Sequence, residues 1–112
     1  MKIYKELLQG TPEWFDIRKG KVTASKAQAI ASNGKGLETY INEVVSEYFS
    51  SAEKEHYSNI HTERGHELEP VARSMYELMN NVVVDQIGFC EYNEFVGCSP
   101  DGLVGDDGMI EI

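Results

Sequence analysis

The sequence predicts an α/β protein of the α+β-like kind, in which N-terminal helices pack on a small mixed or antiparallel sheet. Through much of the chain before Asn81, apolar residues recur at three- and four-residue spacing, which is the period of an amphipathic helix. After Asn81 the chain changes to β-branched and aromatic residues interrupted by turn residues, which is typical of short strands. Because 112 residues suffice for one core, we expect a single domain over residues 1–112.

Two helices are expected in the first half of the chain. The first covers residues 23–31, where alanines favour a helix and Thr23 or Ser25 can cap it. Asn33–Gly36 then forms a turn. The second helix covers residues 37–49, with Thr39 as a candidate cap, and we expect the polar stretch 50–59 to loop out. Its apolar face comprises Leu37, Tyr40, Ile41, Val44, Val45, Tyr48 and Phe49.

A third helix is expected between Thr62 and Asn80, where apolar residues return at the helical period. Pro70 lacks an amide hydrogen, and its ring clashes with the preceding turn of a helix. The regular helix is therefore expected either to begin near Pro70 or to kink there. In the first case Glu67 and Glu69 would lie in its first turn.

Short strands are expected after Asn81. Residues 82–90 are rich in valine and aromatic residues, and a second run, Phe95–Cys98, follows a polar stretch, so the two predict a hairpin. Gly105–Gly108 is a turn between Leu103-Val104 and a third strand, Met109–Ile112.

The net charge of -9 counts against DNA binding by the whole surface, because an acidic surface repels phosphates. It leaves open a local site where metal neutralises carboxylates and a few arginines contact phosphates. Cys90 and Cys98 lack zinc-site spacing, and no secretory leader opens the chain, so we expect reduced thiols in the cytoplasm. No apolar run approaches membrane-spanning length, so we expect no membrane association.

Asp101, in a Pro-Asp-Gly turn, and Glu111, ten residues later, are candidate metal ligands. Enzymes that hydrolyse phosphodiesters hold Mg²⁺ or Mn²⁺ through one or two carboxylates and use a metal-bound water as nucleophile. A hairpin turning near residues 105–108 would bring both side chains to one end of the sheet. The spacing alone leaves two interpretations open, because Asp-Gly after Pro is also a common turn and a glutamate on a strand is commonly solvated.

Asp101 after Pro100, with Glu111 beyond a turn, resembles the first two parts of the PD-(D/E)xK nuclease signature. Over nearly its whole length the chain resembles the family of lambda exonuclease and YqaJ-type phage recombination nucleases. Three blocks in the family's order carry this resemblance: Gly10–Trp14 with Ile17–Ser25, Arg64–Arg73, and Cys98–Leu103 with Ile110–Ile112.

The resemblance implies a metal-dependent deoxyribonuclease, an alkaline exonuclease that recognises 5′ ends of DNA and acts in recombination. Asp101, Glu111 and Glu69 match its catalytic and metal-binding carboxylates for Mg²⁺ or Mn²⁺, and the carbonyl of Ile112 matches a further metal ligand. Without the resemblance, Glu69 in a first helical turn would simply complement the helix dipole.

Arg18 and Ser25 match the pair that binds the terminal 5′-phosphate. A guanidinium fork and a hydroxyl at a helix start suit an anion, although Arg18 beside Lys19 and Lys21 is also typical of a solvated basic turn. Trp14 has two interpretations, stacking on a base or packing in the core, and packing is the more common.

The implied partners are double-stranded DNA ends, further copies of the chain in a ring and a single-strand annealing protein, in the host cytoplasm if the gene is carried by a phage or prophage. The resemblance also implies a catalytic lysine at position 113, one residue past the end of the chain. We therefore expect a C-terminally truncated nuclease core whose 112-residue form is impaired. The alternative is a non-catalytic remnant that acts as an assembly module or as a metal- or DNA-binding module.

Overall fold

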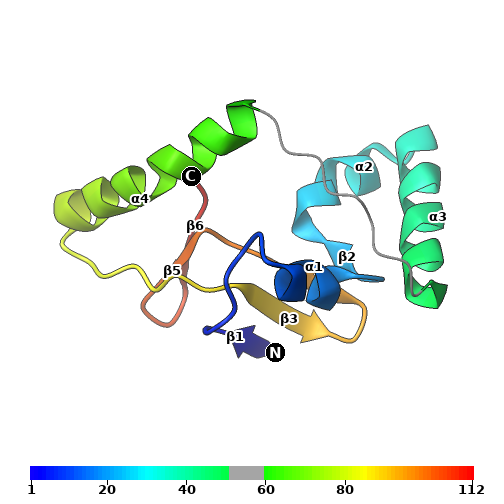
Figure 1. Cartoon of the computed structure of the whole chain (residues 1–112), viewed down its shortest axis with the longest axis horizontal. Coiled ribbons are helices and arrows are strands. Elements are labelled where there is room, and N and C mark those ends of the chain that lie inside the picture. Colours follow the sequence, from blue (N-terminus) through cyan, green and yellow to red (C-terminus); the bar gives the residue numbers. More distant parts are fainter. Residues whose placement is uncertain (51–59) are drawn as a thin grey trace. The chain divides into compact units, whose positions relative to one another are not determined.

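The computed structural model describes residues 1–50 and 60–112 and has the predicted mixture of helices and small sheets (Figure 1). The chain divides into two compact units, each described by itself. The first unit comprises Met1–Ala52 and Ile87–Pro100, and the second comprises Glu53–Gln86 and Asp101–Ile112. The expected loop at residues 50–59 lies, except for Ser50, outside the described residues.

A four-stranded sheet organises the first unit. Its strands are β1 (Lys2–Tyr4), β2 (Val22–Thr23), β3 (Phe89–Asn93) and β4 (Val96–Cys98), in the order β1-β3-β4-β2. The β3–β4 hairpin is antiparallel, as predicted, and places Cys90 opposite Cys98, both with free thiols. Because β1 pairs antiparallel with β3 and β2 pairs parallel with β4, the sheet is mixed.

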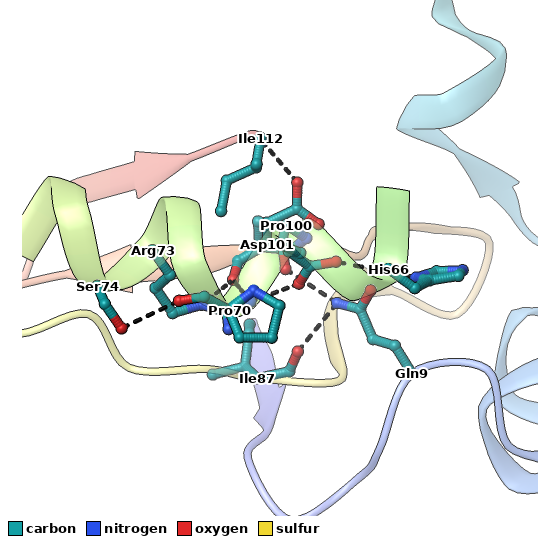
Figure 2. A network of polar contacts seen from close by, with 10 residues as sticks. Gln9, His66, Pro70, Arg73, Ser74, Ile87, Pro100, Asp101 and Ile112 are labelled. Atoms are coloured by element: carbon teal, nitrogen blue, oxygen red, sulfur yellow. Dashed lines mark hydrogen bonds and ion pairs between the residues drawn. The ribbon is translucent and has the colours of Figure 1, made fainter. Parts of the chain in front are cut away.

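Phe89 is the centre of the core of this unit, with no exposed surface. Its ring packs against Tyr4, with 6.5 Å between the ring centroids, and against Gly97. A Cβ on Gly97 would lie 2.2 Å from the Phe89 ring, so no larger residue fits there. The side-chain amide of Gln9 donates to the carbonyls of Ile87 and Pro100 at 3.0 and 2.9 Å, which fixes both ends of the segment that carries the hairpin (Figure 2).

The helices of the first unit are α1 (Pro12–Arg18), a 3₁₀ turn at Ala24–Lys26 that leads into α2 (Ala27–Ser32), and α3 (Lys35–Phe49). The expected helix at residues 23–31 is thus present, but its first turn is 3₁₀. The prediction that Thr39 caps α3 is wrong, because α3 begins at Lys35 with Gly34 at its N-cap position. Asn33, with a φ of 49°, terminates α2 in the left-handed conformation, so the break is shorter than predicted.

The second unit contains α4 (Ile60–Asn80) and the antiparallel pair β5 (Gly102–Val104) and β6 (Gly108–Ile110). The helix begins at Ile60 and continues through Pro70, so the expectation of a start near Pro70 is wrong. The predicted hairpin is present, but β6 ends at Ile110, and Glu111 and Ile112 follow the strand instead of belonging to it. None of the helices in the described ranges is long and apolar enough to cross a membrane.

The expectation of a strand at Val82–Val84 is wrong. The segment turns back at the end of α4, where the amide of Val82 donates to the Glu77 carbonyl at 3.2 Å and that of Val84 to Glu77 Oε1 at 2.8 Å. Asp85 then forms an isolated bridge to Leu103, with hydrogen bonds of 2.8 and 2.9 Å. The backbone groups that a strand would use are therefore occupied by the helix end and by a single β5 residue.

Candidate functional site

Each unit contains one group of candidate functional side chains. The Arg18 group, in the first unit, comprises Trp14, Arg18, Ser25 and Ser99. The carboxylate group, in the second unit, comprises Glu69, Arg73, Asp101, Glu111 and Ile112. The site residues predicted from the sequence are thus distributed over both groups.

Arg18, the last residue of α1, presents its guanidinium to two hydroxyls. Its Nη1 donates to Ser99 Oγ at 2.8 Å and its Nη2 to Ser25 Oγ at 3.3 Å. Ser25 lies in the 3₁₀ turn before α2, and its hydroxyl also lies 3.1 Å from that of Thr23. The two residues predicted to bind a 5′-phosphate thus lie within hydrogen-bonding distance of each other.

Desolvation by partial burial lowers the pKa of Arg18, while the nearby Tyr40, Cys98 and Glu47 act in the opposite direction. Arginine remains a cation at any physiological pH, so this direction describes the environment and not a change of charge. Hydroxyl oxygens are neutral acceptors, and an anion makes stronger hydrogen bonds to a guanidinium. A partly desolvated guanidinium held by hydroxyls is thus suited to receive an anion.

The indole ring of Trp14, one helical turn before Arg18 on α1, packs against the Arg18 guanidinium. The guanidinium carbon lies 4.2 Å from the centroid of the indole ring, a cation–π contact. The indole nitrogen donates to the Gly88 carbonyl and to Ser99 Oγ, both at 3.0 Å. The indole is half-buried and contacts Arg18 and Phe15, outside the buried core, and stacking on a base stays a prediction.

Ser99 belongs to the Arg18 group, although its part there was not predicted from the sequence. Its hydroxyl accepts from both Trp14 and Arg18, although these residues are more than 80 positions away along the chain. The contact between Trp14 and Arg18 could have been predicted from their four-residue spacing, because residues i and i+4 face each other on a helix. The sequence around Ser99 gives no signal that its hydroxyl accepts from Trp14 and Arg18.

The carboxylate group is assembled from α4 and the β5–β6 hairpin. Arg73 Nη2 donates to Glu69 Oε1, and both residues lie on α4. The same guanidinium reaches the main-chain carbonyl of Asp101, at 3.3 Å from Nε and 3.1 Å from Nη2 (Figure 2). Since α4 begins at Ile60, Glu69 does not lie in the first turn, and the helix-dipole interpretation of this residue does not hold.

Asp101 is fixed at the open end of the hairpin. Its amide donates to the Ile110 carbonyl at 3.2 Å, and its Oδ2 accepts from the Ile112 amide at 2.7 Å. Because Gly102 pairs with Ile110, Asp101 just before β5 and Glu111 just after β6 lie at the same end of the two-stranded sheet, as predicted from the turn at residues 105–108. Figure 2 shows the Asp101 carboxylate pointing to Ile112.

The carboxyl of Glu111 responds to its two acidic neighbours. Partial desolvation, the charge of Asp101, a hydrogen bond with Asp101 and the charge of Glu69 all raise the pKa of Glu111. The residue as a whole is exposed, so solvent screens these charges in part. A cation bound near Glu111 would offset the negative charges that act on this carboxyl.

The donor set fits a hard divalent cation in its chemistry. All the side-chain donors are carboxylate oxygens, which Mg²⁺ and Mn²⁺ prefer. Within residues 1–50 and 60–112, no three His, Cys, Asp or Glu side chains are arranged so that they could hold a metal ion. In the structure Glu69 accepts a hydrogen bond from Arg73, and Asp101 Oδ2 accepts one from the Ile112 amide.

Comparison with known proteins gives two kinds of match. Residues 13–112 match the family model of the YqaJ-like viral recombinase domain. The chain is also similar to the crystal structure of an alkaline exonuclease, LHK-Exo, from Laribacter hongkongensis, with 35% identity and a TM-score of 0.77. For LHK-Exo in complex with dAMP the values are 37% and 0.80.

Both structural alignments cover 90% of this chain and 52% of the other. The chain therefore spans about half the length of these solved relatives. A search of curated proteins found no match.

Proposed function

The chain belongs to the family of YqaJ-like viral recombinase domains, and from this membership we propose that it carries the site of a metal-dependent deoxyribonuclease acting on ends of duplex DNA. Two solved structures to which it is similar are those of an alkaline exonuclease, one with a deoxynucleotide bound. The observation that carries the proposal is the arrangement of the carboxylate group. Asp101 and Glu111 lie at one end of the β5–β6 pair, and Arg73 binds both Glu69 and the Asp101 carbonyl.

We propose Glu69, Asp101 and Glu111 as the residues that hold Mg²⁺ or Mn²⁺, with the carbonyl of Ile112 as a further donor. Such a cation supplies an acidified water as nucleophile and positive charge for the phosphate. The hairpin contributes by holding Asp101 and Glu111 at one end of its two strands. The helix α4 contributes Glu69, and a side chain carried by a helix is positioned more precisely than one carried by a loop.

We propose Arg18 and Ser25 as the residues that bind the terminal 5′-phosphate. The two Nη groups of Arg18 already donate in a fork to hydroxyl oxygens. A phosphate would replace these neutral acceptors by charged ones, and the hydroxyl of Ser25 would turn from acceptor to donor. Binding at this group would select DNA with a phosphate at its 5′ end.

The proposed substrate is thus a 5′-phosphorylated end of duplex DNA in the cytoplasm. A ring of subunits and a single-strand annealing partner remain predictions from the family resemblance. The net charge of -9 confines the favourable contact with DNA to local sites such as the Arg18 group.

The test measures metal binding and end binding separately. Calorimetric titration of Mn²⁺ should show a site that Asp101→Asn abolishes. Fluorescence anisotropy with a labelled duplex should show tighter binding to a 5′-phosphate end than to a 5′-hydroxyl end, a preference that Arg18→Gln removes. Arg64→Gln, at an exposed arginine of α4, is the matched control and should keep both properties.

The outcomes separate the candidate functions. Release of nucleotides from linear duplex, dependent on Mn²⁺ and on Asp101, would establish the nuclease. A chain that binds Mn²⁺ and the 5′-phosphate but releases no nucleotide would favour the non-catalytic binding module. Absence of both binding events would refute the proposal.

A further inference from the structure

Arg73 is a buried arginine of α4, with 9% of its surface exposed. A buried guanidinium is costly unless its donors are paired, since the charge has left water. Here the donors are engaged by the Glu69 carboxylate and by the carbonyl of Asp101. The Arg73 side chain therefore binds two of the proposed metal-binding residues, one on α4 and one just before β5.

These contacts determine more than the position of Asp101 alone. The amide, the carbonyl and the carboxylate of Asp101 are bound by Ile110, Arg73 and Ile112 respectively. Glu111 lies between Ile110 and Ile112 in the chain, so fixing Asp101 also restricts Glu111. One guanidinium thus links Glu69 directly to the end of the hairpin.

We propose that Arg73 is a positioning residue of the carboxylate group, which holds Glu69 and the Asp101 carbonyl together and supplies the positive charge that opposes carboxylate repulsion before a cation binds. This inference rests on the proposed function, because it assigns Arg73 a part in preparing that metal site. A lysine keeps the charge but lacks the planar fork, so it cannot bind the carboxylate and the carbonyl in the same geometry. The fork, and not the charge alone, is what the proposal requires.

The first experiment is a calorimetric titration of Mn²⁺ on the whole chain and two variants. Arg73→Lys should weaken Mn²⁺ binding about 10- to 100-fold, the range found when a residue that orients metal ligands is changed. Arg64→Lys makes the same chemical change at an exposed position of α4 and should leave the affinity unchanged. Equal affinities of the wild-type chain and Arg73→Lys would overturn the proposal.

A purely structural role for Arg73 is separated by repeating the substitution in a Glu69→Gln background. If Arg73 acts by positioning ligands, Arg73→Lys should weaken Mn²⁺ binding clearly less in this background, because one of the residues that it orients no longer carries a carboxylate. An equal loss in both backgrounds would indicate general destabilisation and contradict the positioning role. Circular dichroism at the titration temperature ensures that only folded variants are compared.

A second measurement needs no variant and so does not depend on the folding of Arg73→Lys. In ¹H–¹⁵N spectra of the wild-type chain, the Arg73 Nε–H signal should shift during titration with diamagnetic Mg²⁺, in step with the Ile112 amide. A signal that stays unchanged while the Ile112 amide shifts to saturation would overturn the inference and leave the metal site intact. A wild-type chain that binds neither Mg²⁺ nor Mn²⁺ would overturn the proposed metal site, and the positioning role with it.

Discussion

Trp14 and Arg18 show how a single helical turn prepares an anion site. Replacing Trp14 by Leu removes the cation–π contact and both indole hydrogen bonds, so Arg18 would lose its support. We expect Trp14→Leu to weaken binding of a 5′-phosphorylated duplex about 2- to 5-fold, the value of an exposed cation–π contact of roughly 0.5–1 kcal/mol. Fluorescence anisotropy titration with the 5′-phosphorylated duplex measures this loss of affinity.

Trp14→Phe is the matched comparison, because it keeps an aromatic face and loses the indole N–H. It should lie between the wild-type chain and Trp14→Leu in affinity. Equal binding of 5′-phosphate by all three chains would show that the indole makes no contribution to anion binding.

The raised pKa of Glu111 predicts how the stability of the metal-free chain changes with pH. Because its pKa is raised, the folded state binds the proton more tightly than the unfolded state, so this contribution to stability is present at low pH and lost as the pH rises through the folded pKa. The window begins near the ordinary glutamate value of 4.5 and extends upward. We therefore expect Glu111→Gln to raise the melting temperature more at pH 7 than at pH 4.5.

Thermal unfolding in the presence of a chelator measures this difference. Glu94→Gln, in the exposed turn between β3 and β4, is the control and should show no such trend. A Glu111→Gln effect that is the same at both pH values would contradict the prediction.

At the scale of elements, local signals predicted most of the helices and both hairpins, and failures occurred where distant contacts decide. Val82–Val84 has the composition of a strand, but Glu77 occupies its backbone groups. The strands β1 and β2 are too short to give a pattern, and they exist because β3 and β4 offer edges for pairing. Composition thus predicts which segments are apolar, but not which segment their backbone groups pair with through hydrogen bonds.

Pro70 within α4 gives a prediction about element stability. Proline inside a helix removes one hydrogen bond and crowds the preceding turn, at a cost of about 3 kcal/mol. Pro70→Ala should therefore increase the free energy of unfolding by roughly 1–3 kcal/mol and slow amide exchange in the turn before residue 70. Urea unfolding and hydrogen exchange measure the two effects.

Pro12→Ala is the control for this prediction, because Pro12 occupies the first turn of α1, where proline is favourable. It should give no gain in stability. A Pro70→Ala chain no more stable than the wild type would show that the surroundings of α4 have already compensated for the proline.

At the scale of the whole molecule, the site was only partly predictable from the sequence. Spacing placed Asp101 and Glu111 at one end of a hairpin, and the structure agrees, since Gly102 pairs with Ile110 between them. The roles of Arg73 and Ser99 were not predicted, because each acts through contacts with residues far away along the chain. Pattern reasoning identifies which residues carry the chemistry, whereas their supporting partners follow from the fold.

The net charge of -9 and the carboxylate group together predict how salt acts on stability. Monovalent salt screens self-repulsion, so NaCl should raise the melting temperature gradually. Mn²⁺ at the same ionic strength should raise it further, because a ligand bound only by the folded state stabilises that state by about 2.7 kcal/mol at one hundred times its dissociation constant.

Thermal scans at matched ionic strength separate the two effects. Asp101→Asn should keep the response to NaCl and lose the extra response to Mn²⁺, because the diffuse charge remains and the proposed ligand does not. If Asp101→Asn and the wild-type chain respond equally to Mn²⁺, the cation acts through the general acidic surface, and the carboxylates at the end of the β5–β6 hairpin do not form a distinct metal site.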